Sequence, residues 1–165
     1  MATFIQTSGG FIRSFRFTFW SLFSGQIIFA LFALIINVHE PVNFGEFHPN
    51  DIFSYLVPMV VLGGIIAGYF IYKTQIKKSV NETTFKRKLE AYRSTSITRY
   101  AFIEGPNLFC IVAYYLTSNM IFMYMVVVVL IYYLFSYPSL DKMTKEMELS
   151  SQEINQLNDT QFQLH

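Results

Sequence analysis

The chain has 165 residues, a length that suits a single domain. Apolar residues make up 53% of it and charged residues only 14%, whereas an average soluble domain carries about 25% charged residues. The aromatic share of 18% is typical of surfaces that meet lipid and of the aromatic belts at membrane boundaries. The net charge of +1 provides no broad positive field, so we expect no nucleic-acid partner.

Two uncharged apolar runs in the first half of the chain each reach the length of a membrane span, roughly 20 residues. The first covers residues 17–38 and the second covers about 52–72. The first run is longer than the core of a secretory signal peptide, which has about 7–15 residues and precedes a cleavage site of small residues. We therefore interpret it as a span that the protein retains.

Two further apolar runs follow, at about 97–116 and 120–137. The third run carries Arg99 and Glu104, and Pro138 ends the fourth. Only three residues separate these two runs, a link so short that it requires an antiparallel hairpin. The sequence therefore predicts an all-α membrane protein with four transmembrane helices, arranged as two antiparallel hairpins within residues 1–138.

The Lys and Arg residues predict the orientation of the spans. Eight of them lie in residues 73–99, between the second and third spans, and none lies in residues 39–51, between the first and second. Basic loops remain in the cytoplasm. We therefore expect a multi-pass protein of the cell inner membrane with cytoplasmic N- and C-termini.

The basic segment between the second and third spans is predicted to be helical. It lacks Gly and Pro, and Phe85, Leu89 and Tyr92 recur at helical spacing, with Asn81 as a helix cap. Each Lys or Arg near a membrane surface attracts anionic lipid by about 1 kcal/mol. Alternatively, these charges only set the topology. The candidates for contact with lipid headgroups are Lys77, Lys78, Lys86, Arg87 and Lys88.

Residues 139–165 are predicted to form a cytoplasmic helical tail. Apolar residues fall on a short heptad seam, and Ser150 with Glu153 fits a capping box that would start a helix. The tail could pack on the basic helical extension. The alternatives are self-association or a partner helix, and disorder.

Gly63, Gly64 and Gly68 lie in the second span, and the last two form a pair of small residues one helical turn apart. Such pairs allow two helix backbones to approach closely within a membrane. The partner could be another helix of the same chain or a second copy.

Glu104 is the candidate functional residue, because a carboxylate inside a span is costly and marks a functional hypothesis. Asn107 and Tyr100 share its helical face, Arg99 lies five residues before it, and Gln26 in the first span could face it. Pro106 leaves a backbone carbonyl free. These groups could bind a proton or cation, whereas the structural alternative is a pair with Arg99 or a first-turn acid.

No motif for soluble-style catalysis is present, so we expect no enzyme activity and no cofactor. Cys110 is the single cysteine and suits apolar packing. His39 and His48 could join Glu40, Glu46 and Asp51, but their spacing matches no ligand pattern, so we expect no metal site.

Part of the chain resembles the hairpin of the rotary ATPase proteolipid, or subunit c-like, family. The resemblance covers residues 60–116: the glycine helix, the basic loop and the run Tyr100-Ala101-Phe102-Ile103-Glu104. It implies that Glu104 carries an ion. The chain departs from that family in its two additional spans, its tail and its single glycine pair. As a whole it resembles small uncharacterised four-span proteins of bacterial inner membranes.

These features favour a non-enzymatic membrane protein that is a subunit or scaffold of a membrane complex. Its expected partners are membrane lipid and either another protein or further copies of itself. The alternative is a small transporter or a protein that conducts ions or protons through Glu104.

Overall fold

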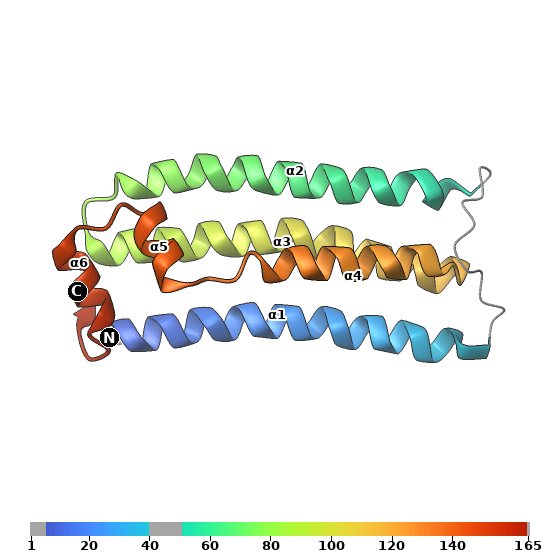
Figure 1. Ribbon diagram of the computed structural model, residues 1–165, viewed down its shortest axis with the longest axis horizontal. Coiled ribbons are helices and arrows are strands. Elements are labelled where there is room, and N and C mark those ends of the chain that lie inside the picture. Colours follow the sequence, from blue (N-terminus) through green and yellow to red (C-terminus); the bar gives the residue numbers. More distant parts are fainter. Residues whose placement is uncertain (1–5, 40–50, 165) are drawn as a thin grey trace, which may run out of the picture.

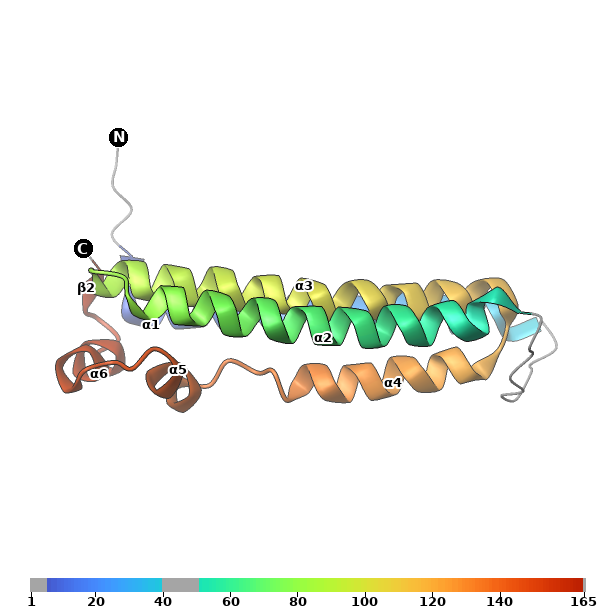
Figure 2. The ribbon, with the colours of Figure 1, turned by 90° about the horizontal axis from the view of Figure 1, so that it is seen from above.

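The structure, a computed structural model, describes residues 6–39 and 51–164. Four long helices run side by side: α1 (Ser8–Ile36), α2 (Ile52–Val80), α3 (Phe85–Thr117) and α4 (Met120–Leu134) (Figure 1). α3 lies between α1 and α2, and α4 lies along one side of these helices (Figure 2). The expectation of an all-α fold is confirmed, with α3 as the central helix that contacts the other three.

Polar side chains start three of the long helices by accepting hydrogen bonds from free amides of the first turn. Thr7 accepts from Gly10 at the start of α1, Asp51 from Phe53 in α2, and Asn119 from Ile121 in α4. Ser118 ends α3 with a left-handed φ of 52°. The chain therefore reverses within two residues and forms the expected tight hairpin between α3 and α4.

α2 and α3 continue beyond the predicted spans, as expected, and meet at residues 81–84. The prediction that Asn81 caps the following helix was wrong. Its backbone N–H donates to the carbonyls of Lys78 and Ser79, so Asn81 closes α2, and α3 begins at Phe85.

α4 ends at Leu134, three residues before the expected end of the fourth span. The amides of Ser136 and Tyr137 donate to the carbonyls three residues back, which makes a turn in place of further helix. Pro138 contributes because proline disfavours the helical conformation of the residue that precedes it.

The tail folds as two short helices, α5 (Leu140–Glu146) and α6 (Ser151–Asn158). Glu148 has a φ of 48° and breaks the helix between them, so the heptad seam is not continuous. The capping box of Ser150 and Glu153 is confirmed at the start of α6. A two-residue strand, β2 (Gln163–Leu164), then pairs with β1 (Gln6–Thr7) before α1.

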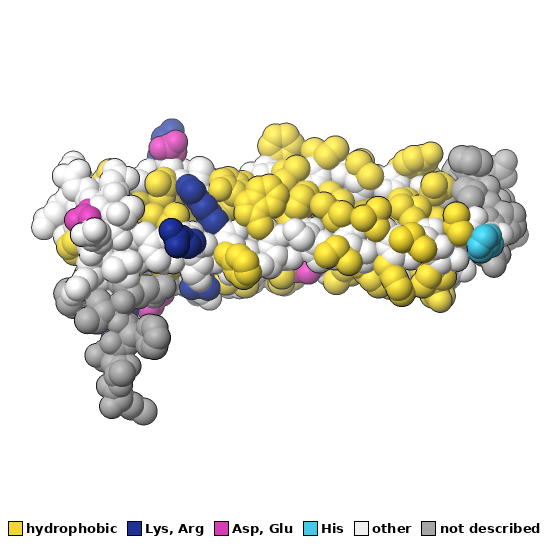
Figure 3. All heavy atoms as spheres, turned by 90° about the horizontal axis from the view of Figure 1, so that it is seen from below, with side chains coloured by type: hydrophobic (Ala, Val, Ile, Leu, Met, Phe, Trp, Pro, Cys, Tyr) yellow, Lys and Arg dark blue, Asp and Glu magenta, His cyan; other side chains and the backbone are white. Residues whose placement is uncertain are grey.

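Two helices are long and apolar enough to cross a membrane: Ser8–His39, which joins α1 to the 3₁₀ turn η1 (Asn37–His39), and α2. Only 22% of the most apolar stretch of each is buried, unlike the core helix of a soluble protein. Figure 3 shows the exposed apolar side chains as a broad band, with most charged side chains toward the tail end. α4 is shorter, and polar residues interrupt α3.

Candidate functional site

A buried polar contact joins the middle of α1 to α3. Asn107 Nδ2 donates a hydrogen bond to Gln26 Oε1 over 2.7 Å, and both side chains are fully buried. Gln26 Nε2 in turn donates to the Leu22 carbonyl over 3.3 Å. Asn107 Oδ1 is buried and has no hydrogen-bond partner. Such an unsatisfied acceptor costs about 1–3 kcal/mol, so this position can accept a proton donor or a cation.

Glu104 lies one turn before Asn107 on α3 and is half-buried. Tyr133 on α4 packs against Tyr100, one turn before Glu104, with ring centroids 5.4 Å apart. Tyr133 is fully buried, and its hydroxyl has no hydrogen-bond partner. Glu104, Asn107 and Tyr133 therefore provide three polar groups along the stretch of α3 from Tyr100 to Asn107 and the α4 residue packed on it.

Arg99 and Tyr100 have contacts of their own, away from the Glu104 carboxylate. The Arg99 guanidinium lies over the Tyr72 ring, 4.8 Å from its centroid, and makes no ion pair with Glu104. Because Arg99 and Glu104 are five residues apart on α3, their side chains point in directions about 140° apart around the helix axis, which explains why they do not pair. The Tyr100 hydroxyl donates to the Ser136 carbonyl over 3.2 Å.

Two of the three predicted packing glycines lie against α3. A Cβ on Gly64 would overlap Pro106 Cγ and lie 2.9 Å from the Phe102 carbonyl oxygen. A Cβ on Gly68 would lie 2.9 Å from Phe102 Cβ. Gly63 faces away, because an added Cβ would meet nothing within 4 Å. The glycine pair therefore brings α2 and α3 together within one chain.

An open groove of about 620 Å³ runs along the outer face of this α2–α3 contact. Its floor is Gly64, Phe102 and Pro106, and its walls are almost wholly apolar. Small residues form the rim in two pairs, each pair one turn apart on its helix: Gly63 with Ala67, and Ala101 with Gly105. We call this feature the α2–α3 groove.

α5 is held against the ends of α2 and α3 nearest their connecting turn by a partly buried cluster of polar side chains. The Tyr72 hydroxyl donates a hydrogen bond to the Glu146 carboxylate. Burial raises the pKa of Tyr92, and the neighbouring Tyr72 and Glu146 raise it further. Burial lowers the pKa of Lys142, as does the Arg99 charge, while Glu146 opposes the shift. No motif in the sequence pairs α5 with these residues.

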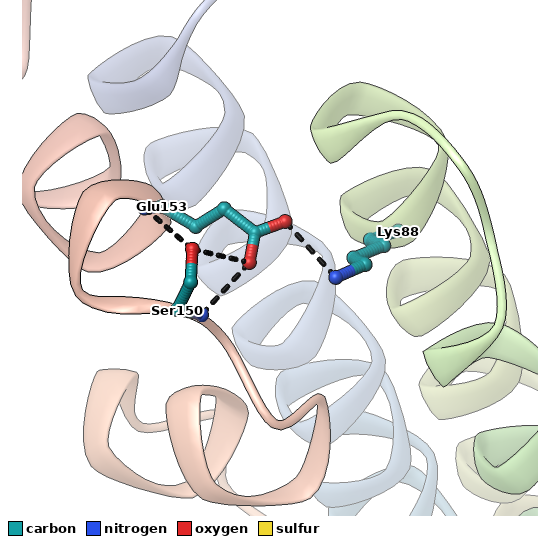
Figure 4. A network of polar contacts seen from close by, with 3 residues as sticks. All are labelled: Lys88, Ser150 and Glu153. Atoms are coloured by element: carbon teal, nitrogen blue, oxygen red, sulfur yellow. Dashed lines mark hydrogen bonds and ion pairs between the residues drawn. The ribbon is translucent and has the colours of Figure 1, made fainter.

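α6 is held by the one ion pair found in the described residues, between Lys88 Nζ and Glu153 Oε1 at 3.0 Å (Figure 4). Glu153 Oε2 accepts from the Ser150 amide over 2.8 Å. Burial raises the pKa of Glu153, but the bonds from Ser150 and the contact with Lys88 together lower it below its ordinary value. Lys88, a predicted lipid contact, therefore binds the tail.

The opposite end of the bundle is closed by Asn37, a residue that no motif in the sequence marks. Its Nδ2 donates to the carbonyls of Tyr114 and Tyr115, over 3.3 and 2.9 Å, and lies 3.2 Å from Ser118 Oγ. These carbonyls belong to the last turn of α3, and the Tyr114 carbonyl also accepts from the Ser118 amide over 2.8 Å. Asn37 therefore fixes the C-terminal end of α1 to that of α3.

Within the described part of the chain, no three His, Cys, Asp or Glu side chains gather as a metal site. His48 and the acids at positions 40 and 46 lie outside the described residues. No protein-family model, curated protein or solved structure matches the chain.

Proposed function

We propose that the protein is a non-enzymatic, four-span protein of a bacterial inner membrane and a subunit or scaffold of a larger membrane complex. Both termini and the α2–α3 turn are cytoplasmic in this proposal. The basic residues of 73–99 support that orientation.

Outward apolar side chains on α4 support its place in the membrane. Tyr124, Val128 and Ile131 are each more than half exposed, which would be costly in water. α4 has 15 residues and is therefore about 22 Å long. The apolar residues Phe135 and Tyr137 extend this surface toward the roughly 30 Å of a bilayer core. α3 contacts the other three long helices, and its polar side chains Tyr100 and Asn107 are buried away from lipid.

The α2–α3 groove is the observation that supports a role in assembly. Its rim of small residues would allow the backbone of a further transmembrane helix to approach closely, which is how helices associate in lipid. Gly63, Ala101 and Gly105 are exposed, and nothing in the chain would meet a Cβ on Gly63 or Gly105. We therefore place the contact with another subunit at this groove.

The test is a variant that fills the groove without disturbing the fold. Gly63→Leu should leave the chain folded and reduce the mass of the particle purified in mild detergent, measured by light scattering. Gly25→Leu is the matched control, because Gly25 is also an exposed helical glycine with nothing within 4 Å of an added Cβ. Mass analysis distinguishes a second copy from another protein. A wild type that runs as a lone monomer, or an unchanged mass for Gly63→Leu, would overturn the proposed interface.

A second candidate function is proton or cation transfer through Glu104. The specific observation in its favour is the pair of buried atoms without partners near it, Asn107 Oδ1 and Tyr133 Oη. Either atom could bind the transferred ion or a water molecule that carries a proton.

Glu104→Gln separates the two roles of this residue. Under the transfer hypothesis, the variant folds normally but loses any ion flux across vesicles that contain the purified protein. Labelling by a hydrophobic carbodiimide, which reacts with protonated carboxyls in apolar surroundings, should also disappear. Equal flux in both proteins, with no labelling of the wild type, would exclude this function.

A further inference from the structure

A second pocket, of about 380 Å³, lies between the first turns of α1 and the folded tail. Arg13 and Arg16 supply its charge, and no acidic residue lines it. Ile12, Leu140 and Leu157 give it apolar walls. Gly9, Asn158 and Thr160 complete the lining. We call this feature the arginine pocket.

The two guanidinium groups of the arginine pocket have no carboxylate partner. Neither makes an ion pair with a described residue. Arg16 is half-buried, and its Nε is buried without a hydrogen-bond partner, whereas Arg13 is exposed. Arginine presents its donors in a planar fork that matches the oxygens of a phosphate. The pocket therefore has the charge and the free donors that an anionic phosphate requires.

The wall opposite the arginines is held in place by the return of the tail to α1. Ser8 Oγ donates to the Gln156 carbonyl over 3.0 Å, and the Gly9 amide donates to the Thr160 carbonyl over 3.3 Å. The pairing of β1 with β2 continues this contact. The pocket is therefore built by two distant parts of the sequence, and a ligand in it would contact both.

The depth of the arginine pocket matches the headgroup layer of the proposed membrane. Arg16 directly precedes the apolar run that starts at Phe17, so the guanidinium lies at the inner boundary. Arg99 lies near the start of the third predicted span and marks the same boundary there. Lys86 and Lys88 precede Arg99 by 13 and 11 residues, which places them roughly 16–20 Å beyond the boundary. The headgroup region is only about 5–8 Å thick on each side, so these lysines lie outside it.

We propose that the arginine pocket binds the phosphate headgroup of an anionic phospholipid from the cytoplasmic leaflet. Arg13 and Arg16 hold the phosphate, and Ile12, Leu140 and Leu157 pack against the glycerol and the upper acyl chains. The lipid joins α1 to the tail. This inference rests on the proposed insertion of α1 in the membrane.

The test is native mass spectrometry of the full chain in detergent, with added phosphatidylglycerol or with phosphatidylcholine of the same acyl chains. The wild type should retain one phosphatidylglycerol in preference to phosphatidylcholine. The double variant Arg13→Gln, Arg16→Gln should lose affinity by about tenfold or more, since a charged hydrogen bond contributes about 1.5–3 kcal/mol. The control Lys86→Gln, Arg87→Gln also removes two positive charges, at positions 13 and 12 residues before Arg99 and therefore beyond the headgroup layer, and should retain the wild-type affinity.

Competition and extraction measurements distinguish a bound lipid from a soluble phosphate and from a protein outside the membrane. Excess glycerol phosphate should not displace the lipid, and displacement would mean that the pocket binds a soluble phosphate.

If the double variant fails to fold, as judged by circular dichroism, Arg13→Gln alone serves as the test, because the Arg13 side chain is exposed. A wild type that alkaline carbonate extracts from membranes refutes the proposed function. A wild type that stays in the membrane without preferring phosphatidylglycerol, or equal losses in both double variants, overturns only the pocket.

Discussion

Replacing Gly64 by Ala tests how closely α2 and α3 approach each other. The added methyl would overlap the Pro106 ring and lie 2.9 Å from the Phe102 carbonyl oxygen. Neither group can move easily, because one is a ring fixed to the backbone and the other is backbone itself. Overpacking of this kind costs about 1–3 kcal/mol.

Gly63→Ala is the matched control for this prediction. Both residues lie in the middle of α2, and both substitutions gain the same helix propensity, up to about 1 kcal/mol. An added Cβ at position 63 meets nothing within 4 Å. The difference in unfolding free energy between the two variants therefore isolates the overlap, and we expect Gly64→Ala to be less stable by about 1–3 kcal/mol.

The measurement is unfolding of the purified variants in one detergent, by denaturant or heat. Gly64→Leu should lose more than Gly64→Ala does, and more than Leu62→Ala, whose side chain is 61% exposed in the wild type. Equal stability of Gly63→Ala and Gly64→Ala would show that the two helices do not approach closely at Gly64 and would refute the reasoning.

Three other predictions concern the ends and the middle of the bundle. Because the pKa of Glu153 is lowered in the folded state, its stabilisation of α6 is present at neutral pH and lost on acidification through that pKa; the hydrogen-exchange protection factors of α6 should fall there, and Glu153→Gln should remove this pH dependence. Gln26→Ala leaves Asn107 Nδ2 unpaired and should cost about 1–3 kcal/mol, with a non-additive loss in the double variant with Asn107→Ala. In a cysteine-free background, an impermeant maleimide should label a cysteine at position 43 in intact cells but not one at position 81; the reverse result would invert the topology.

The periodic and uninterrupted parts of the sequence predicted the fold well. The lack of Gly and Pro between residues 69 and 104 predicted that α2 and α3 continue past the apolar runs, and Leu89 and Tyr92 are buried as their spacing indicated. Boundaries that depend on a few hydrogen bonds were less predictable. An Asn at position 81 is compatible with closing one helix or with starting the next, and only the backbone geometry distinguishes these two roles.

The contacts between distant segments could be anticipated only in part. The position of Gln26 in the first span indicated that it could face the Glu104 site, and the structure pairs it with Asn107, one turn beyond Glu104. Counting residues along the third span also grouped Arg99 with Glu104. That count neglected the angle between the two side chains around the helix and the Tyr72 ring, which the Arg99 guanidinium contacts instead. The tail contacts, such as Lys88 with Glu153, depend on the break at Glu148, which no residue pattern announces.

The pairing of residues 6–7 with residues 163–164 has a consequence for the order of folding during synthesis. The first strand leaves the ribosome long before its partner is made, and it has no other strand to pair with in the described chain. The four long helices must therefore assemble before β2 can pair with β1 and close this end of the bundle. Contacts between residues so far apart in sequence form slowly. A truncation before residue 163 should therefore slow or prevent this closure and leave assembly of the four long helices unchanged, which a pulse of protease during synthesis can detect.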